Sequence, residues 1–390
     1  MVRSYCWICI LVATALVSVL TPKAGVAVGY LQHNLVSDQS GVADHTDADL
    51  VNAWGVAFNP TGPAWIADNH SGKSTLYDGL GAKNSLVVGI PDATGTVPLG
   101  ASTGIVFYGG TNFVVTQGAD SGPAKFIFSS EDGVISAWSP NVPLPAPSTV
   151  AHVAADRSSV NAIYKGLAIG STGGNDFLYA TDFHNNRIDV FNGSFGLTSP
   201  AGNFTDPNMP AGFAPFGIQN IGGQLFVTYA KQDTDAEDDA PGPGNGFVDI
   251  FDLSGNLVKR LVSQGNLNSP WGLALAPANF GELSNALLVG NFGSGRIQAY
   301  NSTTGTFLGT LSDSGGIPVT IDGLWGMQFG NGANNQPTNT LFFAAGPGAE
   351  AHGLFGRIDV AVPEPSCALL TIVGSCFVAV RRGRRSVRAA

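Results

Sequence analysis

Three histidines stand where they can serve an acid–base or metal site. His70 and His184 each follow an aspartate by two residues, in a turn after an apolar run, and His352 lies in a longer Gly-rich loop. If the repeats described below form a ring, loops from different repeats meet over one mouth of its channel. Asn52 and Asp322 are further polar candidates for that mouth. A histidine in an exposed surface turn is the more common situation, and that alternative stays open.

Three tryptophans occupy one recurring position. Trp54, Trp271 and Trp325 each stand directly before a glycine, and Phe216 holds the same place in another copy. Indole rings at a channel mouth can stack on sugar rings, whereas indole rings between neighbouring repeats serve packing, which we favour. The candidate ligand-binding set is therefore Asn52, Trp54, His70, His184, Trp271, Asp322 and Trp325.

The segment DTDAEDDAPGPGN (233–245) carries five carboxylates and raises the question of a calcium site. An EF-hand loop needs Gly at its sixth position and Glu at its twelfth, but counting from Asp233 these are Asp238 and Gly244. A solvated acidic loop is the better interpretation. Calcium is nevertheless the divalent cation that we carry as a candidate cofactor.

No nucleophile motif accompanies these candidates. The patterns GxSxG, HExxH and a phosphate-binding Gly loop are absent from residues 28–362. We therefore assign no catalytic residue and keep two hypotheses. The first is a binding or structural module that contacts glycan or protein, and the alternative is a metal-dependent hydrolase or lyase acting at the channel mouth.

An internal repeat of about 50 residues dominates the chain. A short apolar segment with a central glycine recurs as AWGVAF, STGIVF, YKGLAI, PFGIQN, PWGLAL and LWGMQF. Further runs rich in Val, Ile, Phe and Tyr follow each copy, separated by Gly, Asn and Asp, which is typical of antiparallel β-strands. In the second unit we take NFVVT (112–116) as the second strand.

Six units of four strands predict an all-β, six-bladed β-propeller over residues 28–361. The sixth unit supplies only three strands before the chain continues into Pro-Glu-Pro. The strand-like run YLQHNLVSD (30–38) belongs to no unit. We expect it to add the missing outer strand and close the ring.

The segment YATDFHNNRIDVF (179–191) resembles the NHL repeat, and that resemblance implies a β-propeller. NHL-like propellers bind RNA, proteins or small molecules, and some are enzymes. An acidic or amide residue ending one strand and a basic residue beginning the next are interpreted as structural pairs across a hairpin. These pairs are Asp68 with Lys73, Asp182 with Arg187, and Asn291 with Arg296. Gluconolactonase-type propellers hold a metal through a Glu on the first inner strand, where this chain has Asn52.

The N-terminal and C-terminal segments of the sequence predict the localisation of the protein. Residues 1–27 have the basic, apolar and small-residue parts of a secretory signal peptide. Residues 362–390 combine Pro363-Glu364-Pro365, an apolar run, and an arginine cluster that includes Arg381, Arg382, Arg384 and Arg385, and they resemble the PEP-CTERM sorting signal. That resemblance implies transient membrane insertion of the C-terminal helix and recognition by an exosortase. It also implies delivery to the cell surface or extracellular matrix of a bacterium with an outer envelope.

The amino-acid composition argues against several classes of site and partner. All four cysteines lie in the two terminal segments, so residues 28–362 hold no thiol for a disulfide or a zinc site. The same residues contain 11 Lys and Arg against 27 Asp and Glu, which argues against nucleic acid as a partner. Together with the resemblances, this predicts an uncharacterised type of exported NHL-like propeller.

Overall fold

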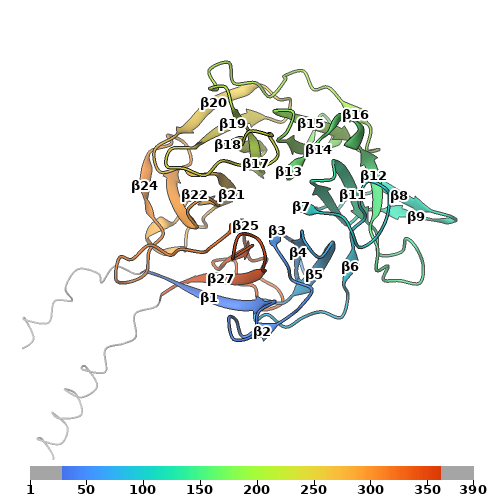
Figure 1. The fold of residues 1–390 in the computed structure, drawn as a ribbon, viewed down its shortest axis with the longest axis horizontal. Helices are drawn as coiled ribbons and strands as arrows, with labels where there is room; N and C mark the ends of the chain where they lie inside the picture. Colours follow the sequence, from blue (N-terminus) through green and yellow to red (C-terminus); the bar gives the residue numbers. More distant parts are fainter. Residues whose placement is uncertain (1–28, 362–390) are drawn as a thin grey trace, which may run out of the picture. The chain divides into compact units, whose positions relative to one another are not determined.

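A computed structural model describes residues 29–361, in which six main β-sheets are arranged as a ring (Figure 1). The predicted all-β, six-bladed propeller is confirmed. Helical structure in these residues consists of two 3₁₀ turns, η1 (Ser158–Val160) and η2 (Gly281–Leu283). Within residues 29–361, no helix has the length and apolar composition that a membrane span requires. The predicted signal peptide (1–27) and sorting tail (362–390) lie outside the described residues.

Blades 1 to 3 follow one another along the chain, each beginning with the strand that lines the channel. Blade 1 contains β3 (Ala53–Phe58), β4 (Ala64–Asp68), β5 (Lys73–Tyr77) and β6 (Val88–Gly89). Blade 2 contains β7 (Ser102–Phe107), β10 (Phe126–Ser130), β11 (Val134–Trp138) and β12 (His152–Asp156). Blade 3 contains β13 (Tyr164–Thr172), β14 (Asn175–Asp182), β15 (Arg187–Asn192) and β16 (Leu197–Thr198).

Blades 4 to 6 complete the ring in the same order. Blade 4 contains β17 (Phe213–Ile221), β18 (Gln224–Lys231), β19 (Gly246–Asp252) and β20 (Leu257–Ser263). Blade 5 contains β21 (Pro270–Leu275), β22 (Ala286–Asn291), β23 (Arg296–Asn301) and β24 (Phe307–Thr310). Blade 6 contains β25 (Leu324–Phe329), β26 (Leu341–Ala345), β27 (Leu354–Val360), β1 (Tyr30–Ser37) and the short β2 (His45–Thr46).

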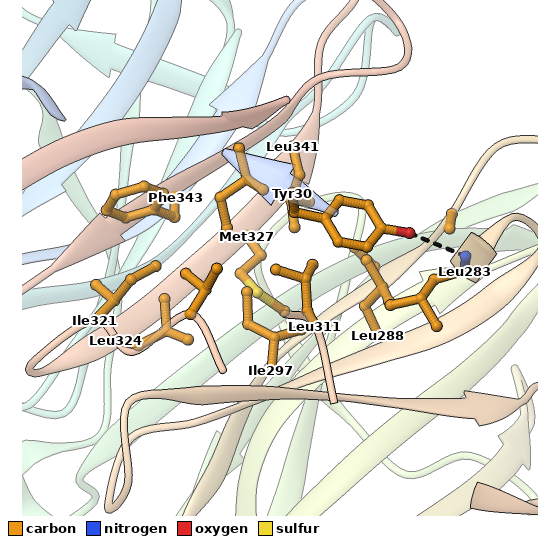
Figure 2. Packing of buried hydrophobic residues seen from close by; sticks show 14 of the residues in the cluster. Tyr30, Leu283, Leu288, Ile297, Leu311, Ile321, Leu324, Met327, Leu341 and Phe343 are labelled. Atoms are coloured by element: carbon orange, nitrogen blue, oxygen red, sulfur yellow. Dashed lines mark hydrogen bonds between the residues drawn. The ribbon is translucent and has the colours of Figure 1, made fainter. Parts of the chain in front are cut away.

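The N-terminal strand closes the ring, as predicted. β1 runs antiparallel to β27, with Tyr30 opposite Val360 and Ser37 opposite Leu354. Tyr30 also reaches the core between blades 5 and 6, where its hydroxyl donates to the Phe280 carbonyl and accepts from the Leu283 amide, both at 2.9 Å (Figure 2). β1 thus supplies both the fourth strand of blade 6 and an anchor to blade 5.

The repeated glycine lies where the inner strands of adjacent blades cross. A Cβ atom on Gly217 would stand 2.0 Å from the Trp271 carbonyl oxygen, and one on Gly326 would stand 2.4 Å from that of Trp54. The other four repeated glycines, Gly55, Gly104, Gly166 and Gly272, would place a Cβ 2.5–2.8 Å from backbone of the next blade. Any side chain here would push the blades apart, so contact between blades explains the repeat that the sequence displays.

Blade 2 departs from the expectation. The predicted second strand, 112–116, contributes to β8 (Val114–Gln117), which pairs only with β9 (Asp120–Pro123) in a separate hairpin. The second strand of the blade is β10, which pairs with β7 and β11. Every residue of β10 is buried, whereas β8 is mostly exposed. Both runs have strand-forming composition, and only burial between neighbouring blades selects β10.

Candidate functional site

Aromatic side chains fill one end of the channel. The rings of Trp54 and Trp325 stack with their centroids 3.7 Å apart, and Phe292 stacks on Trp325 at 3.9 Å. Trp271 meets both tryptophans edge to face, at 6.1 and 5.9 Å. Trp54 and Trp325 are each 1% exposed, so they pack the channel and offer no face to a ligand. Trp271 is partly exposed, unlike Trp54 and Trp325, and its indole Nε1 donates to the Lys165 backbone carbonyl at 3.1 Å.

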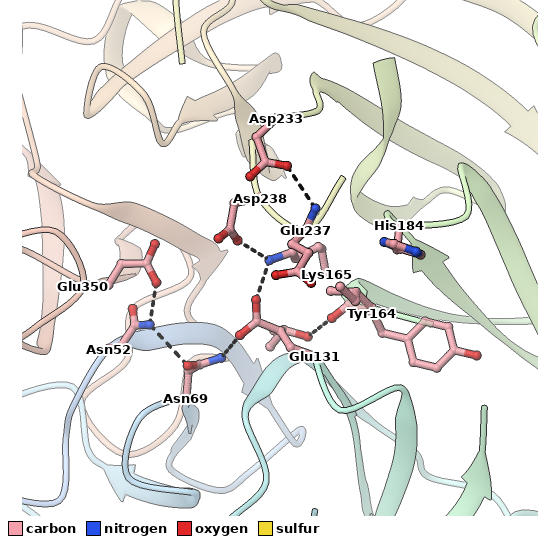
Figure 3. Close-up of polar contacts among 12 residues, drawn as sticks. Asn52, Asn69, Glu131, Tyr164, Lys165, His184, Asp233, Glu237, Asp238 and Glu350 are labelled. Carbon is pink, nitrogen blue, oxygen red and sulfur yellow. Dashed lines mark hydrogen bonds and ion pairs between the residues drawn. The ribbon is translucent and has the colours of Figure 1, made fainter. Parts of the chain in front are cut away.

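A set of polar side chains that we call the polar belt contacts this aromatic floor through Lys165 and Trp54. Figure 3 shows the hydrogen bonds within the belt. Its members come from the ends of inner strands and from the loops that join second to third strands, and they represent five of the six blades. The belt consists of Asn52 and Asn69 of blade 1, Glu131 of blade 2, Lys165 of blade 3, Asp238 of blade 4 and Glu350 of blade 6.

Hydrogen bonds join the belt into one chain. The Asn52 amide nitrogen Nδ2 donates to Glu350 Oε2 at 2.8 Å and lies 3.4 Å from Asn69 Oδ1. Asn69 Nδ2 donates to Glu131 Oε2 at 2.8 Å. Glu131 Oε1 in turn accepts from the Lys165 ammonium. The arrangement holds amide, carboxyl and ammonium groups in fixed orientations around the mouth.

Lys165 is the most deeply buried charge of the belt. Its side chain is 1% exposed, and its ammonium is bound by Glu131 and, at 2.8 Å, by Asp238. The nitrogen also lies 5.3 Å from the centre of the Trp54 ring, in a cation–π contact. Burial alone would lower the pKa of Lys165, but Glu131 and Asp238 together outweigh it and raise that pKa above its usual value. Lys165 therefore remains a fixed positive charge.

Two carboxyl groups near Lys165 have pKa values that are raised toward neutral pH. Burial raises the pKa of Glu350 to about 7, although the hydrogen bond from Asn52 opposes this change. Burial also raises the pKa of Asp239 to about 6. Near neutral pH, Glu350 thus exchanges between a proton-donating acid and an accepting carboxylate, which is the property required of a general acid or base.

The acidic loop between β18 and β19 is folded against the mouth. Asp238 contacts Lys165, and the His184 ring lies 3.3 Å from the Ala236 carbonyl oxygen. Gln232 donates to the Phe183 carbonyl at 2.7 Å. Asp238 is 72% exposed, so the loop combines a solvated outer surface with a charged contact to the belt.

The predicted histidines do not converge on one point. His352 bonds to Asp38 at 2.9 Å, His184 contacts the blade 4 loop, and His70 is exposed. Asp322 accepts from the Gly348 amide at 2.8 Å and is also exposed. No group of three or more His, Asp or Glu side chains within residues 29–361 has the geometry to hold a metal ion. Of the predicted set, Asn52 belongs to the belt, and Trp54 and Trp271 contact Lys165.

The predicted hairpin pairs differ among blades. Asp182 and Arg187 form an ion pair at 2.9 Å. Asp68 instead accepts from the Thr75 amide at 2.9 Å, while Lys73 pairs with Asp49 at 2.5 Å. In blade 5, Asn291 Nδ2 donates to the Arg296 backbone carbonyl at 3.3 Å, and Asn291 Oδ1 accepts from the Asn268 amide and not from the Arg296 side chain.

The belt residues that sequence reasoning missed carried a positional signal. Lys165 directly precedes Gly166 and is the one charged residue at the place held elsewhere by Trp54, Trp271 and Trp325. Asn69 and Glu131 occupy equivalent places, one residue after the second strands β4 and β10. The incorrect second strand in blade 2 concealed this equivalence. Asp238 and Glu350 lie in irregular loops where no repeat position marks them.

The opposite mouth of the channel has a different character. A cavity of about 290 Å³ opens there between the far ends of the inner strands. Its lining includes Phe58, Ile105 and Phe107 together with the carboxamides Gln219 and Gln328, and it contains no charged residue. The two mouths therefore offer distinct chemistry.

A closed six-bladed propeller with one polar and one uncharged mouth is the class of protein that these features define. The chain is 34% identical over 334 residues to uncharacterized protein R648 of Acanthamoeba polyphaga mimivirus, an alignment covering 83% of this chain and 78% of the relative. It is 31% identical over 345 residues to uncharacterized protein L690 of the same virus, covering 86% and 87%. The chain belongs to the family of these uncharacterised proteins. No family model matches it.

Solved structures agree on the fold. Virginiamycin B lyase from Staphylococcus aureus aligns with a TM-score of 0.50 and 15% identity over 85% of this chain and 98% of that one. A Bacteroides thetaiotaomicron protein of unknown function aligns with a TM-score of 0.53 and 10% identity, covering 85% and 76%. At these identities the likeness concerns the propeller fold alone.

Proposed function

We propose that the protein is an exported propeller that binds a glycan at the polar belt. The observation that carries this proposal is the hydrogen-bonded chain of amide and carboxyl groups beside the partly exposed Trp271. The carboxylates of Glu131 and Asp238 reach solvent and can accept hydrogen bonds from sugar hydroxyls, while an indole packs on the apolar face of a sugar ring. The buried amides of Asn52 and Asn69 hold the belt in place. Five blades fix the belt, so little entropy is lost on binding.

Export is supported by the sequence of the two ends. The N-terminal signal-peptide pattern and the Pro-Glu-Pro, apolar and arginine tail both predict transfer across a membrane, with an exosortase as the partner that reads the tail. Fractionation of cells that express the full chain tests this part. Recovery from the surface or medium is expected, whereas recovery only with cytoplasmic proteins would contradict it.

A glycan array probed with the labelled full chain tests binding. We expect selective binding of saccharides and its loss in Asn69→Leu, which removes both belt contacts of that amide. Gln328→Ala at the opposite mouth is the matched control and should bind as the unmodified protein does. Loss of binding in the control alone would move the site to the opposite mouth, and an array without signal would refute glycan binding.

One observation favours a second candidate, a hydrolase or lyase acting at the same mouth. Glu350 lies beside the belt with a pKa raised by burial to about 7, a value suited to proton transfer at neutral pH. A screen of lactones and esters, with and without added divalent cations, tests it. Turnover that Glu350→Gln abolishes would favour catalysis, and the absence of turnover under both conditions would favour binding alone.

A further inference from the structure

The cavity at the mouth opposite the belt has a wall built by several blades and an aromatic floor. Blades 1, 2, 3, 4 and 6 line its volume of about 290 Å³. A narrower space of about 30 Å³ shares Gln219 and Gln328 with the cavity and reaches Trp271. Trp54 and Trp325, stacked and buried, fill the channel beside Trp271. The cavity is therefore open to solvent at one mouth and closed toward the belt.

The lining of this cavity carries no charge. Within residues 29–361 it consists of apolar side chains and the carboxamides of Gln219, Asn220 and Gln328. A charged ligand would lose its water here without meeting an opposite charge, which is unfavourable. A ligand of this mouth is therefore uncharged, in contrast to the charged groups of the belt.

Two of the three carboxamides are free to bind a ligand. The Asn220 side chain is already used, because its Nδ2 donates to the Ile169 carbonyl at 2.8 Å and its Oδ1 accepts from the Gly223 amide at 3.1 Å. Gln219 and Gln328 are partly exposed, and neither side chain bonds to another residue in the described part of the chain. Each of them offers two N–H donors and one carbonyl acceptor.

The backbone of the inner strands offers groups of the same kind. Each inner strand stands at the end of its sheet and pairs on one side only, and the six inner strands surround the channel (Figure 1). A strand edge of this type presents both N–H and C=O groups. A ligand that carries a donor and an acceptor together, as a carboxamide does, matches the glutamines and this edge.

The polar and apolar parts of the lining lie on different sides. Gln219 belongs to blade 4 and Gln328 to blade 6, so the two free carboxamides flank blade 5. Blade 2 stands across the ring from blade 5 and contributes Ile105, Val106 and Phe107 to the lining. A bound molecule thus meets hydrogen-bonding groups at one end and an apolar wall at the other.

We infer that the opposite mouth is a second ligand site, which binds a small uncharged molecule made of an apolar ring and a carboxamide group. The ring packs against residues 105–107, and the carboxamide bonds to Gln219 and Gln328. The cavity volume is near the lower end of the range for small-molecule sites, which suits a single ring. The inference does not depend on glycan binding at the belt.

Benzamide, benzoate and benzylamine test the inference, because they share one ring and differ in charge at neutral pH. Their binding to the full chain is measured at pH 7 by ligand-observed NMR titration. We expect benzamide to bind at least tenfold more tightly than the two ions, since only the ions lose hydration without gaining a counter-charge. Equal affinity for benzamide and either ion would overturn the inference.

Two variants locate the bound probe. Replacing both Gln219 and Gln328 with leucine should weaken benzamide binding about tenfold, because its carboxamide loses its hydrogen-bond partners. Val106→Trp, at a partly exposed position of the lining, should fill the cavity and abolish binding. Gln117→Leu on the exposed part of β8 is the matched control and should bind benzamide as the unmodified protein does. Melting temperatures of all variants show whether they are folded.

The remaining outcomes are decisive as well. Benzamide binding that persists at full strength in folded Val106→Trp would place the probe elsewhere and overturn the inference. Absence of binding for all three probes would also overturn it, and the result of the glycan array would be unaffected. Weaker binding in the double leucine variant together with loss in Val106→Trp would support both the site and the role of its carboxamides.

Discussion

At the scale of single residues, the belt shows how one substitution within a repeat changes the chemistry of a channel. Three of six blades place tryptophan before the repeated glycine, and blade 3 places Lys165 there. A cation that deep inside the protein requires partners, and these come from loops of blades 2 and 4. The site therefore depends on contacts between blades that no single repeat contains.

Replacing Lys165 with methionine should lower the free energy of unfolding by about 2 kcal/mol. Loss of one partner of a buried ion pair costs more than this, but Asp238 is 72% exposed and water compensates part of the loss. Urea denaturation provides the measurement. Combined with Glu131→Gln, the change should cost less than the sum of the two single variants. Additive costs would show that Lys165 and Glu131 do not interact.

Glu350→Gln should change stability in a pH-dependent way. The pKa of Glu350 is about 7 in the folded protein and about 4.3 in an unfolded chain, so its protonation favours folding. That contribution is complete below pH 4 and is lost as the pH rises through 7. The glutamine variant avoids this loss, and it should be more stable than the unmodified protein by about 1 kcal/mol at pH 8.

The measurement is urea denaturation of the variant and the unmodified protein at pH 4 and pH 8. Their difference in unfolding free energy should disappear at pH 4. A difference of the same size at both pH values would show that the effect arises from packing rather than ionisation. Glu282→Gln, which alters an exposed carboxyl far along the chain from the belt, serves as the control.

At the scale of elements, the inner strands determine how the blades meet. Each inner strand approaches the next through its glycine, and the aromatic or polar residue just before that glycine contributes to the channel end. The same feature that packs the ring therefore also aligns the residues that form the floor and part of the belt.

Gly217→Ala should destabilise the protein by about 3 kcal/mol, because its methyl group would stand 2.0 Å from the Trp271 carbonyl oxygen of the next blade. The expected result is a lower melting temperature together with a shift in tryptophan fluorescence, since Trp271 must move. Gly89→Ala in β6 is the matched control, since its Cβ would find only ordinary contacts at 3.5 Å and beyond. Equal losses in the two variants would contradict the crossing argument.

At the scale of the whole molecule, the ring depends on the strand that precedes its first blade. β1 buries Tyr30, Leu35 and Val36 and covers the edge of β27. The apolar burial of these three side chains corresponds to about 5 kcal/mol. Without β1, blade 6 would present an open strand edge, which favours association between chains.

Deletion of residues 30–37 should therefore make the protein aggregate, as size-exclusion chromatography would detect. The milder Tyr30→Phe change keeps the strand and removes only the hydroxyl that bonds Phe280 and Leu283. We expect that variant to remain folded and to lose about 1–2 kcal/mol of unfolding free energy. A deletion variant with unchanged elution and melting temperature would show that the ring does not need this strand.

The sequence by itself determined the fold class, the number of blades and the closing strand. Strand composition, turn residues and the glycine spacing are local properties that recur in every unit, so they can be detected without knowing which strands pair. The second strand of blade 2 was missed because β8 and β10 have similar composition and differ in burial, which belongs to the assembled ring.

Only the tertiary structure decided which polar residues form the site. Asn52 and Glu350 are 298 positions apart in the chain, and Lys165 and Asp238 are 73 apart, so their contacts follow from ring closure and from the paths of irregular loops. The tryptophans illustrate the same limit, because their spacing fits either a ligand platform or a packed floor. The burial of Trp54 and Trp325 against each other, which no local pattern specifies, assigns them to packing.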